Sequence, residues 1–244
     1  MIVESAQNET FKRFLSLTTS KGLKEEGLFL LSGSKLVAEF LAKPTLKVEY
    51  EILTPNHNSL TIGVRQFFVS PALFAQVDVL GTHAPILVVQ QPEIPVLSEE
   101  DVAQGALQGI VPVVPIGDPG NLGAFIRSCE AFAVPRVILA REAAHPFLPK
   151  SVKASAGSVL RVPLARGPAL AEFPPARSIA LDMDGQSIND FVWPAQAYLL
   201  VGEEGPGFGA ASYPTRICIP TAGVESLNVV VAGSIALSRI PQKK

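Results

Sequence analysis

Two patterns of hydrophobic positions divide this chain. From residue 8 to about 91, the helix-like stretches FKRFLSL and KLVAEFL alternate with the strand-like stretches FLLSG, VEYEIL, FFVS and ILVVQ. From residue 107 onward the apolar runs are continuous, namely VPVVPIG, RVILA, SIALD, AYLLVG and RICIP, and helix-length segments separate them. Continuous apolar strands that alternate with helices are typical of a mostly parallel sheet covered on both faces. The pattern predicts an α/β protein with a small α/β domain over residues 1–92 and a parallel-sheet domain over residues 107–244.

The stretch between these domains, residues 93–106, follows neither pattern. It is rich in proline and acidic residues and has no apolar periodicity. We interpret it as a linker with room for one short helix.

Composition narrows the classes of protein. With 48% hydrophobic and 17% charged residues among 244, the chain should be globular. Its apolar runs fall far short of the roughly 20 residues that cross a bilayer, so we expect no membrane association. The first residues carry no secretory or transit pattern, which favours the cytoplasm. A net charge of -2 argues against a generally basic nucleic-acid-binding protein.

The two cysteines do not indicate a metal site. Cys129 and Cys218 stand in apolar surroundings without CxxC spacing or a nearby pair of histidines. We interpret both as buried small side chains and expect neither a disulfide nor a bound metal.

Ligands of parallel α/β sheets bind beyond the carboxyl ends of the strands, which directs attention to three loops. The first is DPGNLGAFIRSCEAF, residues 118–132. Pro119, Gly120 and Gly123 predict a tight turn into a helix, on which Asn121 and Arg127, six residues apart, are expected to share roughly one face. An arginine beneath a cleft can bind a phosphate or a ribose oxygen. The alternative is an exposed helix whose arginine meets only water.

The second loop is VGEEGPGFG, residues 201–209. It lacks the lysine of a phosphate-binding P-loop and the spacing of a dinucleotide-binding loop. Its carboxylates, Glu203 and Glu204, would repel a triphosphate and would suit a cationic ligand such as a sulfonium compound. A plain glycine-rich turn is the alternative reading.

The third loop lies within IPTAGVESLNVVVAGSIAL, residues 219–237. A strand ends at Ile219, and a helix is expected to run to about Arg239, where Pro241 stops it. Ser226 stands at the start of this helix and is a candidate cap.

The order and spacing of these three loops closely resemble the three motifs of the SpoU family of RNA ribose methyltransferases. The segments KASAGSVLRVPL and LDMDGQSI also resemble family segments, so the likeness spans residues 108–241. The stretch FKRFLSLTTSKGLKEEGLFLLSG is similar to the L30-like substrate-binding domain of many members, which points to ribosomal RNA. The resemblance implies a SPOUT domain with a deep C-terminal trefoil knot, S-adenosylmethionine as cofactor, and a homodimer paired through the knot helices.

Site residues follow from the same resemblance. Gly202, Ile219 and Leu227 would contact the cofactor, largely through backbone atoms. The catalytic side would be lined by Asn121, Arg127, Glu204, Ser226 and Asn228. Arginine is too basic to act as a literal proton acceptor, so the expected role of Arg127 is to stabilise the alkoxide that develops at a ribose 2′-oxygen.

Three positions depart from the family pattern. Val230 stands where a small or hydroxylated residue is frequent, Ala133 where glycine is common, and Thr221 where methionine is frequent. They bear on the shape of the pocket rather than on the reaction. Two other functions stay open at this point: a non-catalytic RNA-binding or ribosome-assembly protein of the same fold, and a methyltransferase that acts on transfer RNA.

Overall fold

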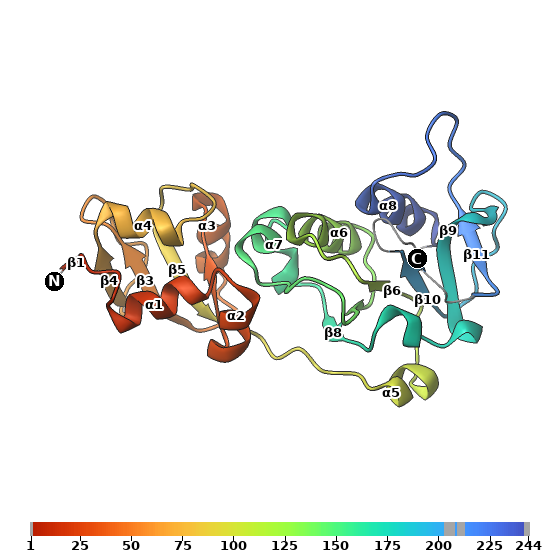
Figure 1. Ribbon diagram of the computed structural model, residues 1–244, viewed down its shortest axis with the longest axis horizontal. Helices are drawn as coiled ribbons and strands as arrows, with labels where there is room; N and C mark the ends of the chain where they lie inside the picture. Colours follow the sequence, from red (N-terminus) through yellow and green to blue (C-terminus); the bar gives the residue numbers. More distant parts are fainter. Residues whose placement is uncertain (1, 203–207, 209–212, 242–244) are drawn as a thin grey trace. The chain divides into compact units, whose positions relative to one another are not determined.

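The structure is a computed structural model that describes residues 2–202, 208 and 213–241. The chain forms two compact units (Figure 1). The first comprises Met1–Glu93 with His145–Gly157, and the second comprises Ile94–Ala144 with Ser158–Lys244.

The first unit is built on a mixed five-stranded sheet. Its strand order is β1-β4-β3-β5-β2, in which β4 runs parallel to β1 and β3, and β5 runs antiparallel to β3 and β2. The strands are β1 (Ile2–Val3), β2 (Leu28–Leu31), β3 (Val48–Leu53), β4 (Arg65–Val69) and β5 (Ile86–Gln90). The helices are α1 (Glu9–Ser16), α2 (Ser20–Glu26), α3 (Ser34–Ala42), α4 (Pro71–Val77) and α7 (Pro149–Ala154).

Aromatic residues hold the first helix on this sheet. Phe11 and Phe14, one turn apart on α1, are fully buried. The ring of Phe14 meets Tyr50 on β3 and Phe67 on β4 edge-on, with centroid separations of 5.3 and 5.0 Å. The apolar residues of FKRFLSL therefore form one stripe of an amphipathic helix, and this stripe packs on the sheet.

The second unit contains a six-stranded sheet in the order β11-β9-β10-β6-β7-β8. All five neighbouring pairs are parallel, which confirms the predicted parallel sheet. Its strands are β6 (Ile110–Val114), β7 (Val137–Leu139), β8 (Leu164–Arg166), β9 (Ser178–Ser187), β10 (Ala197–Val201) and β11 (Arg216–Cys218). Its helices are α5 (Glu99–Gln104), α6 (Pro119–Ala131) and α8 (Val229–Arg239), with the short 3₁₀ helices η1 (Ser158–Leu160), η2 (Leu170–Glu172) and η3 (Pro175–Arg177).

The stretch interpreted as a linker contributes to the core of the second unit. Ser98 caps α5 through a capping box with Asp101. Val102 is fully buried, and its carbonyl accepts a hydrogen bond of 2.9 Å from the hydroxyl of Tyr198. The guanidinium of Arg177 donates to carbonyl groups at the C-terminal end of the same helix. The short helix is thus fixed to the core rather than left in solvent.

Helix α6 begins earlier than the glycine spacing suggested. The carboxylate of Asp118 accepts a hydrogen bond of 2.7 Å from the backbone N–H of Asn121 and so caps the helix, and Pro119 occupies the first helical position. The prediction that Pro119, Gly120 and Gly123 form a turn before the helix was wrong, because all three belong to its first two turns.

The cap of α8 also differs from the predicted one. The side-chain oxygen of Asn228, not Ser226, accepts hydrogen bonds from the backbone N–H groups of Val230 and Val231, at 2.9 and 3.4 Å. Ser226 lies two residues before the cap and is exposed. The helix ends at Arg239, as predicted.

Helices α6 and α8 pack side by side (Figure 1). A Cβ atom at Gly233 would lie 2.3 Å from Cε2 of Phe125, so only glycine permits this approach. The hydroxyl of Ser234 donates to that of Ser128 across the same contact, at 2.7 Å. The first and third motifs are therefore joined through one tight helix pair.

None of the described helices combines the length and apolar character that crossing a bilayer requires. No group of three or more His, Cys, Asp or Glu side chains suited to a metal ion occurs within the described residues. Cys129 is buried and Cys218 half-buried, and both are free thiols. Burial raises the pKa of the Cys129 thiol, which keeps it protonated and unreactive.

The end of α6 generates a prediction on stability. Ala133 follows the helix with a φ of 50°, in the left-handed region where glycine is free of strain. We expect Ala133→Gly to stabilise the second unit by about 1 kcal/mol, because the cost of this conformation for an L-residue exceeds the added chain entropy. Thermal unfolding should show a rise in Tm of roughly 2–4 °C. Ala133→Ser, which keeps a Cβ atom, should show no such rise, and an equal gain in both variants would contradict the explanation.

Candidate functional site

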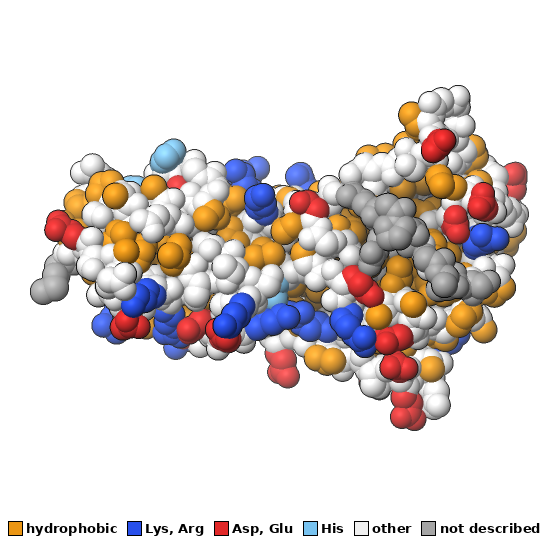
Figure 2. All heavy atoms as spheres, in the orientation of Figure 1, with side chains coloured by type: hydrophobic (Ala, Val, Ile, Leu, Met, Phe, Trp, Pro, Cys, Tyr) orange, Lys and Arg blue, Asp and Glu red, His pale blue; other side chains and the backbone are white. Residues whose placement is uncertain are grey.

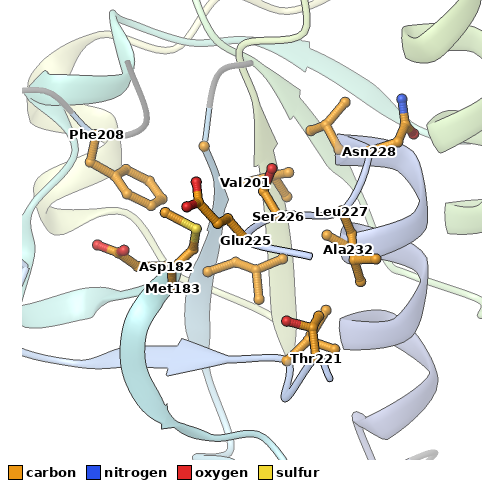
Figure 3. Close-up of a pocket in the computed structure, with 14 residues that line it drawn as sticks. Asp182, Met183, Val201, Phe208, Thr221, Glu225, Ser226, Leu227, Asn228 and Ala232 are labelled. Atoms are coloured by element: carbon orange, nitrogen blue, oxygen red, sulfur yellow. The ribbon is translucent and has the colours of Figure 1, made fainter. Parts of the chain in front are cut away.

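A cavity of about 540 Å³ lies in the second unit, at the carboxyl ends of strands β10 and β11 and beside the middle of strand β9. Strand β9 contributes Leu181 to Met183, strand β10 contributes Val201 and Gly202, and Ile219 follows strand β11. The loop that leads into α8, and Ala232 on α8 itself, form the opposite wall (Figure 3). The size is within the range of pockets that bind small molecules and cofactors. Its place is the one where ligands of parallel sheets bind.

Five of the predicted site residues line this cavity together. They comprise the three expected to contact the cofactor and two of those expected on the catalytic side: Gly202, Ile219, Leu227, Ser226 and Asn228. Figure 3 shows the side chain of Asn228 directed away from Glu225, toward the start of α8 that it caps. Glu204 lies outside the described residues.

The remaining two predicted residues lie on α6, and neither is among the residues that line the cavity. At 100° per residue, Asn121 and Arg127 stand about 120° apart around the helix axis, so the expectation that they share one face was wrong. Asn121 is half-buried in the first turn, whereas Arg127 is exposed. Among the described residues, the guanidinium of Arg127 has no hydrogen-bond or ion-pair partner.

The cavity combines two carboxylates with an apolar wall. Asp182 lines it from β9 and lies 3.5 Å from the guanidinium of Arg216, while Glu225 projects from the loop before α8 (Figure 3). Met183 and Phe208 line the same cavity. A cavity of this kind suits a ligand that carries both a positive charge and a flat apolar part.

Sequence reasoning missed these carboxylates. The segment LDMDGQSI was recognised as similar to the family, but no residue of it was assigned to the site. The available signal was its position: Asp182 and Met183 follow the apolar run SIAL, just as the three motif loops follow theirs. Glu225 stands inside the third motif, one residue before Ser226, and was also passed over.

A second cluster lies beside Arg127 at the C-terminal end of α6. The carboxylate of Glu130 accepts two hydrogen bonds from Arg161, with Nε–Oε1 at 2.6 Å and Nη2–Oε2 at 2.9 Å. The hydroxyl of Ser158 on η1 also donates to Oε2. The hydrogen bonds from Arg161, and to a smaller degree that from Ser158, hold the pKa of Glu130 below its usual value against the opposing effect of burial.

Comparison with known proteins agrees with this geometry. The model of the SpoU rRNA methylase family matches residues 109–238, a range that contains the cavity, helix α6 and helix α8. These residues make up more than half of the chain.

Three relatives illustrate the similarity. The chain is 38% identical to the ribosomal RNA small subunit methyltransferase G 2 of Syntrophobacter fumaroxidans over 96% of its own length, but it spans only 48% of that protein. It is 27% identical to the 23S rRNA (guanosine(2553)-2'-O)-methyltransferase RlmP of Bacillus subtilis, with 96% of each chain covered. The crystal structure of the SpoU methyltransferase AviRb from Streptomyces viridochromogenes, in complex with AdoMet, has a TM-score of 0.79 at 24% identity and covers 96% of this chain and 97% of AviRb.

The full-length structural match shows the shared fold, and the family match covers both the cavity and the helix that bears Arg127. This chain belongs to the SpoU rRNA methylase family.

Proposed function

We propose that this protein methylates a ribose 2′-hydroxyl in ribosomal RNA, with S-adenosylmethionine as the methyl donor. The observation that carries the proposal is the cavity inside the matched family region, lined by residues of the second and third motifs. RlmP, which aligns over 96% of both chains, is named for this reaction on 23S rRNA. The small-subunit enzyme of Syntrophobacter aligns over about half of its length, so its named activity need not reside in the matched half.

The cavity fits S-adenosylmethionine in size and charge. Gly202, Ile219 and Leu227 would hold the cofactor, and Met183 and Phe208 offer an apolar surface to the adenine ring. The carboxylates of Asp182 and Glu225 suit its positive sulfonium and ammonium groups. When bound, the cofactor supplies an electrophilic methyl group.

The side chains of the protein then position and activate the acceptor hydroxyl. A ribose 2′-hydroxyl is a weak nucleophile near neutral pH, so it must be held in line and its developing negative charge must be stabilised. Arg127 provides that positive charge and a contact to the adjacent phosphate. Ser226 holds the ribose or the loop, and Asn228 keeps the loop in register by capping α8. Asn121 and Glu204 complete the catalytic side in this proposal.

We propose that residues 1–92, which make up most of the first unit, form an L30-like domain that binds the RNA substrate. Its helices α1 and α2 carry the basic side chains Lys12, Arg13, Lys21 and Lys24. Figure 2 shows Lys and Arg side chains gathered with acidic ones along the edge where these helices lie. Three of the four pair with glutamates, so RNA phosphates would compete with these ion pairs.

We further propose that two copies pair and that the second unit forms the deep trefoil knot of the SPOUT fold. Pairing accounts for the separation of Arg127 from the cavity in its own chain, since a second copy can bring its Arg127 to the donor.

Pairing predicts a dimer in solution. Sedimentation equilibrium of the full chain should give twice the monomer mass of 25.9 kDa. A monomer at micromolar concentration that still transfers methyl groups at full rate would contradict the shared site.

The cavity predicts a specific loss of cofactor binding. In Ala232→Leu the added side chain projects from α8 into the cavity, so we expect the affinity for S-adenosylmethionine in calorimetry to fall by at least about tenfold. Ser238→Leu places the same side chain on an exposed position of the same helix and should leave the affinity unchanged. Equal affinities in both variants would show that the cofactor does not bind in this cavity.

The reaction is tested by transfer of a labelled methyl group from S-adenosylmethionine to ribosomal RNA. We expect label in one ribose of the RNA, and a loss of about 10²- to 10³-fold in kcat for Arg127→Ala with cofactor binding retained. Arg136→Ala, an exposed arginine just beyond α6, is the control and should remain active.

Mapping of 2′-O-methyl positions in 23S, 16S and transfer RNA, from cells with and without the protein, identifies the substrate. Label in transfer RNA alone would favour the tRNA enzyme. Cofactor binding without transfer to any RNA would favour a non-catalytic RNA-binding protein. A fully active Arg127→Ala variant would refute the role assigned to this side chain.

A further inference from the structure

We propose that Arg161 keeps Arg127 available to the RNA by occupying the carboxylate of Glu130, which would otherwise pair with Arg127 along α6. This inference rests on the proposed function, because it assumes that Arg127 acts on the substrate. It assigns Arg161 as a positioning residue that does not itself touch the reacting atoms.

Helix geometry brings Glu130 within reach of Arg127. The two residues stand three positions apart on α6, about 60° around the axis and less than one turn along it. Oppositely charged side chains at this spacing attract each other on a helix surface. Glu130 is also the only acidic residue of α6, so no other residue of the helix competes for the arginine.

In the structure, the Glu130 carboxylate already accepts hydrogen bonds from other residues. Both oxygens of Glu130 accept from the guanidinium of Arg161, and Oε2 also accepts from the hydroxyl of Ser158. This bidentate ion pair is stronger and more directional than a single-contact ion pair between neighbouring side chains on a helix surface. Arg127 meanwhile remains exposed and has no polar partner for its side chain among the described residues.

The position of Arg161 is fixed independently of the ion pair. Helix η1 packs against α6, with Ser158 fully buried and Val159 2% exposed. The backbone N–H of Arg161 donates to the carbonyl of Ser158 at 3.0 Å, which sets Arg161 at the end of this anchored turn. The backbone of Arg161 is therefore held where its guanidinium reaches Glu130.

Removing Arg161 should therefore free the Glu130 carboxylate to pair with Arg127. An exposed pair of this kind is weak, so part of the population would lose a free Arg127 rather than all of it. We expect Arg161→Ala to lower kcat by about two- to sixfold at saturating RNA and cofactor.

The decisive variant is the double substitution Arg161→Ala with Glu130→Gln. Glutamine keeps the shape of Glu130 but carries no charge to attract Arg127, so the double variant should regain most of the wild-type kcat. Glu130→Gln alone should be close to wild type. A purely structural clamp predicts the opposite, since the double variant restores no contact between α6 and η1.

The experiment uses the full chain, tritium-labelled S-adenosylmethionine, and 23S and 16S rRNA transcribed in vitro, with kcat and KM determined for each variant. Arg141→Ala is the matched control, because Arg141 forms a similar pair with Glu172 at 2.8 Å, away from α6. It should match wild type. Thermal unfolding of the Arg161→Ala and double variants should be alike, which separates rescue of activity from rescue of stability.

Recovery of kcat in the double variant supports the inference. If the double variant is as slow as Arg161→Ala, or if Arg161→Ala is as fast as wild type, the inference is overturned. A fully active Arg127→Ala variant instead overturns the role of Arg127 on which both proposals depend, so the two failures are distinguishable.

Discussion

The close contact between α6 and α8 is the constraint on which the candidate site depends. Gly233 lets the ring of Phe125 approach the backbone of α8 to a distance that no side chain at this position would permit. This contact joins the helix that bears Arg127 to the helix whose first turn lines the cavity. Because protein cores do not deform continuously, a change in this contact would move the two helices together with the groups they carry.

Charge is divided between two parts of the second unit. The cavity presents the carboxylates of Asp182 and Glu225, whereas the exposed surface of α6 presents Arg127. The two reactants of the proposed reaction differ in the same way, since the methyl donor is cationic and RNA is a polyanion. Separation lets each reactant meet the charge that attracts it.

Most of the architecture could be predicted from periodicity. Each apolar run predicted a parallel strand. A strand that is buried on both faces of a sheet is apolar at successive positions, so it shows no alternation of apolar and polar residues. The short strand β8 was missed because its three residues, Leu164–Arg166, form no such run. Helix starts were less accessible, since Asp118 and Asn228 became caps through local hydrogen bonds that periodicity does not encode.

The cavity shows a similar limit. Gly202, Ile219 and Leu227 were predicted from motif resemblance and do line it. Asp182 comes from β9, a strand that lies between β10 and β11 in the sheet although it precedes both in the sequence. Order along the chain does not reveal which strand stands between two others. Residues contributed by such a strand become visible only when the sheet order is known.

For Arg127 the surroundings expected from the sequence differ from those in the structure. The resemblance selected it, but the helical period places it about 120° from Asn121, the residue that was expected to share its face. Its immediate neighbour on the helix surface is Glu130, a residue of opposite charge. In our proposal Arg127 stays unpaired because the neighbouring Glu130 is already paired with a second arginine, Arg161. Whether Arg127 is available to the RNA therefore depends on three charged side chains, two on α6 and Arg161 just after η1, and neither the motif nor the helix alone determines it.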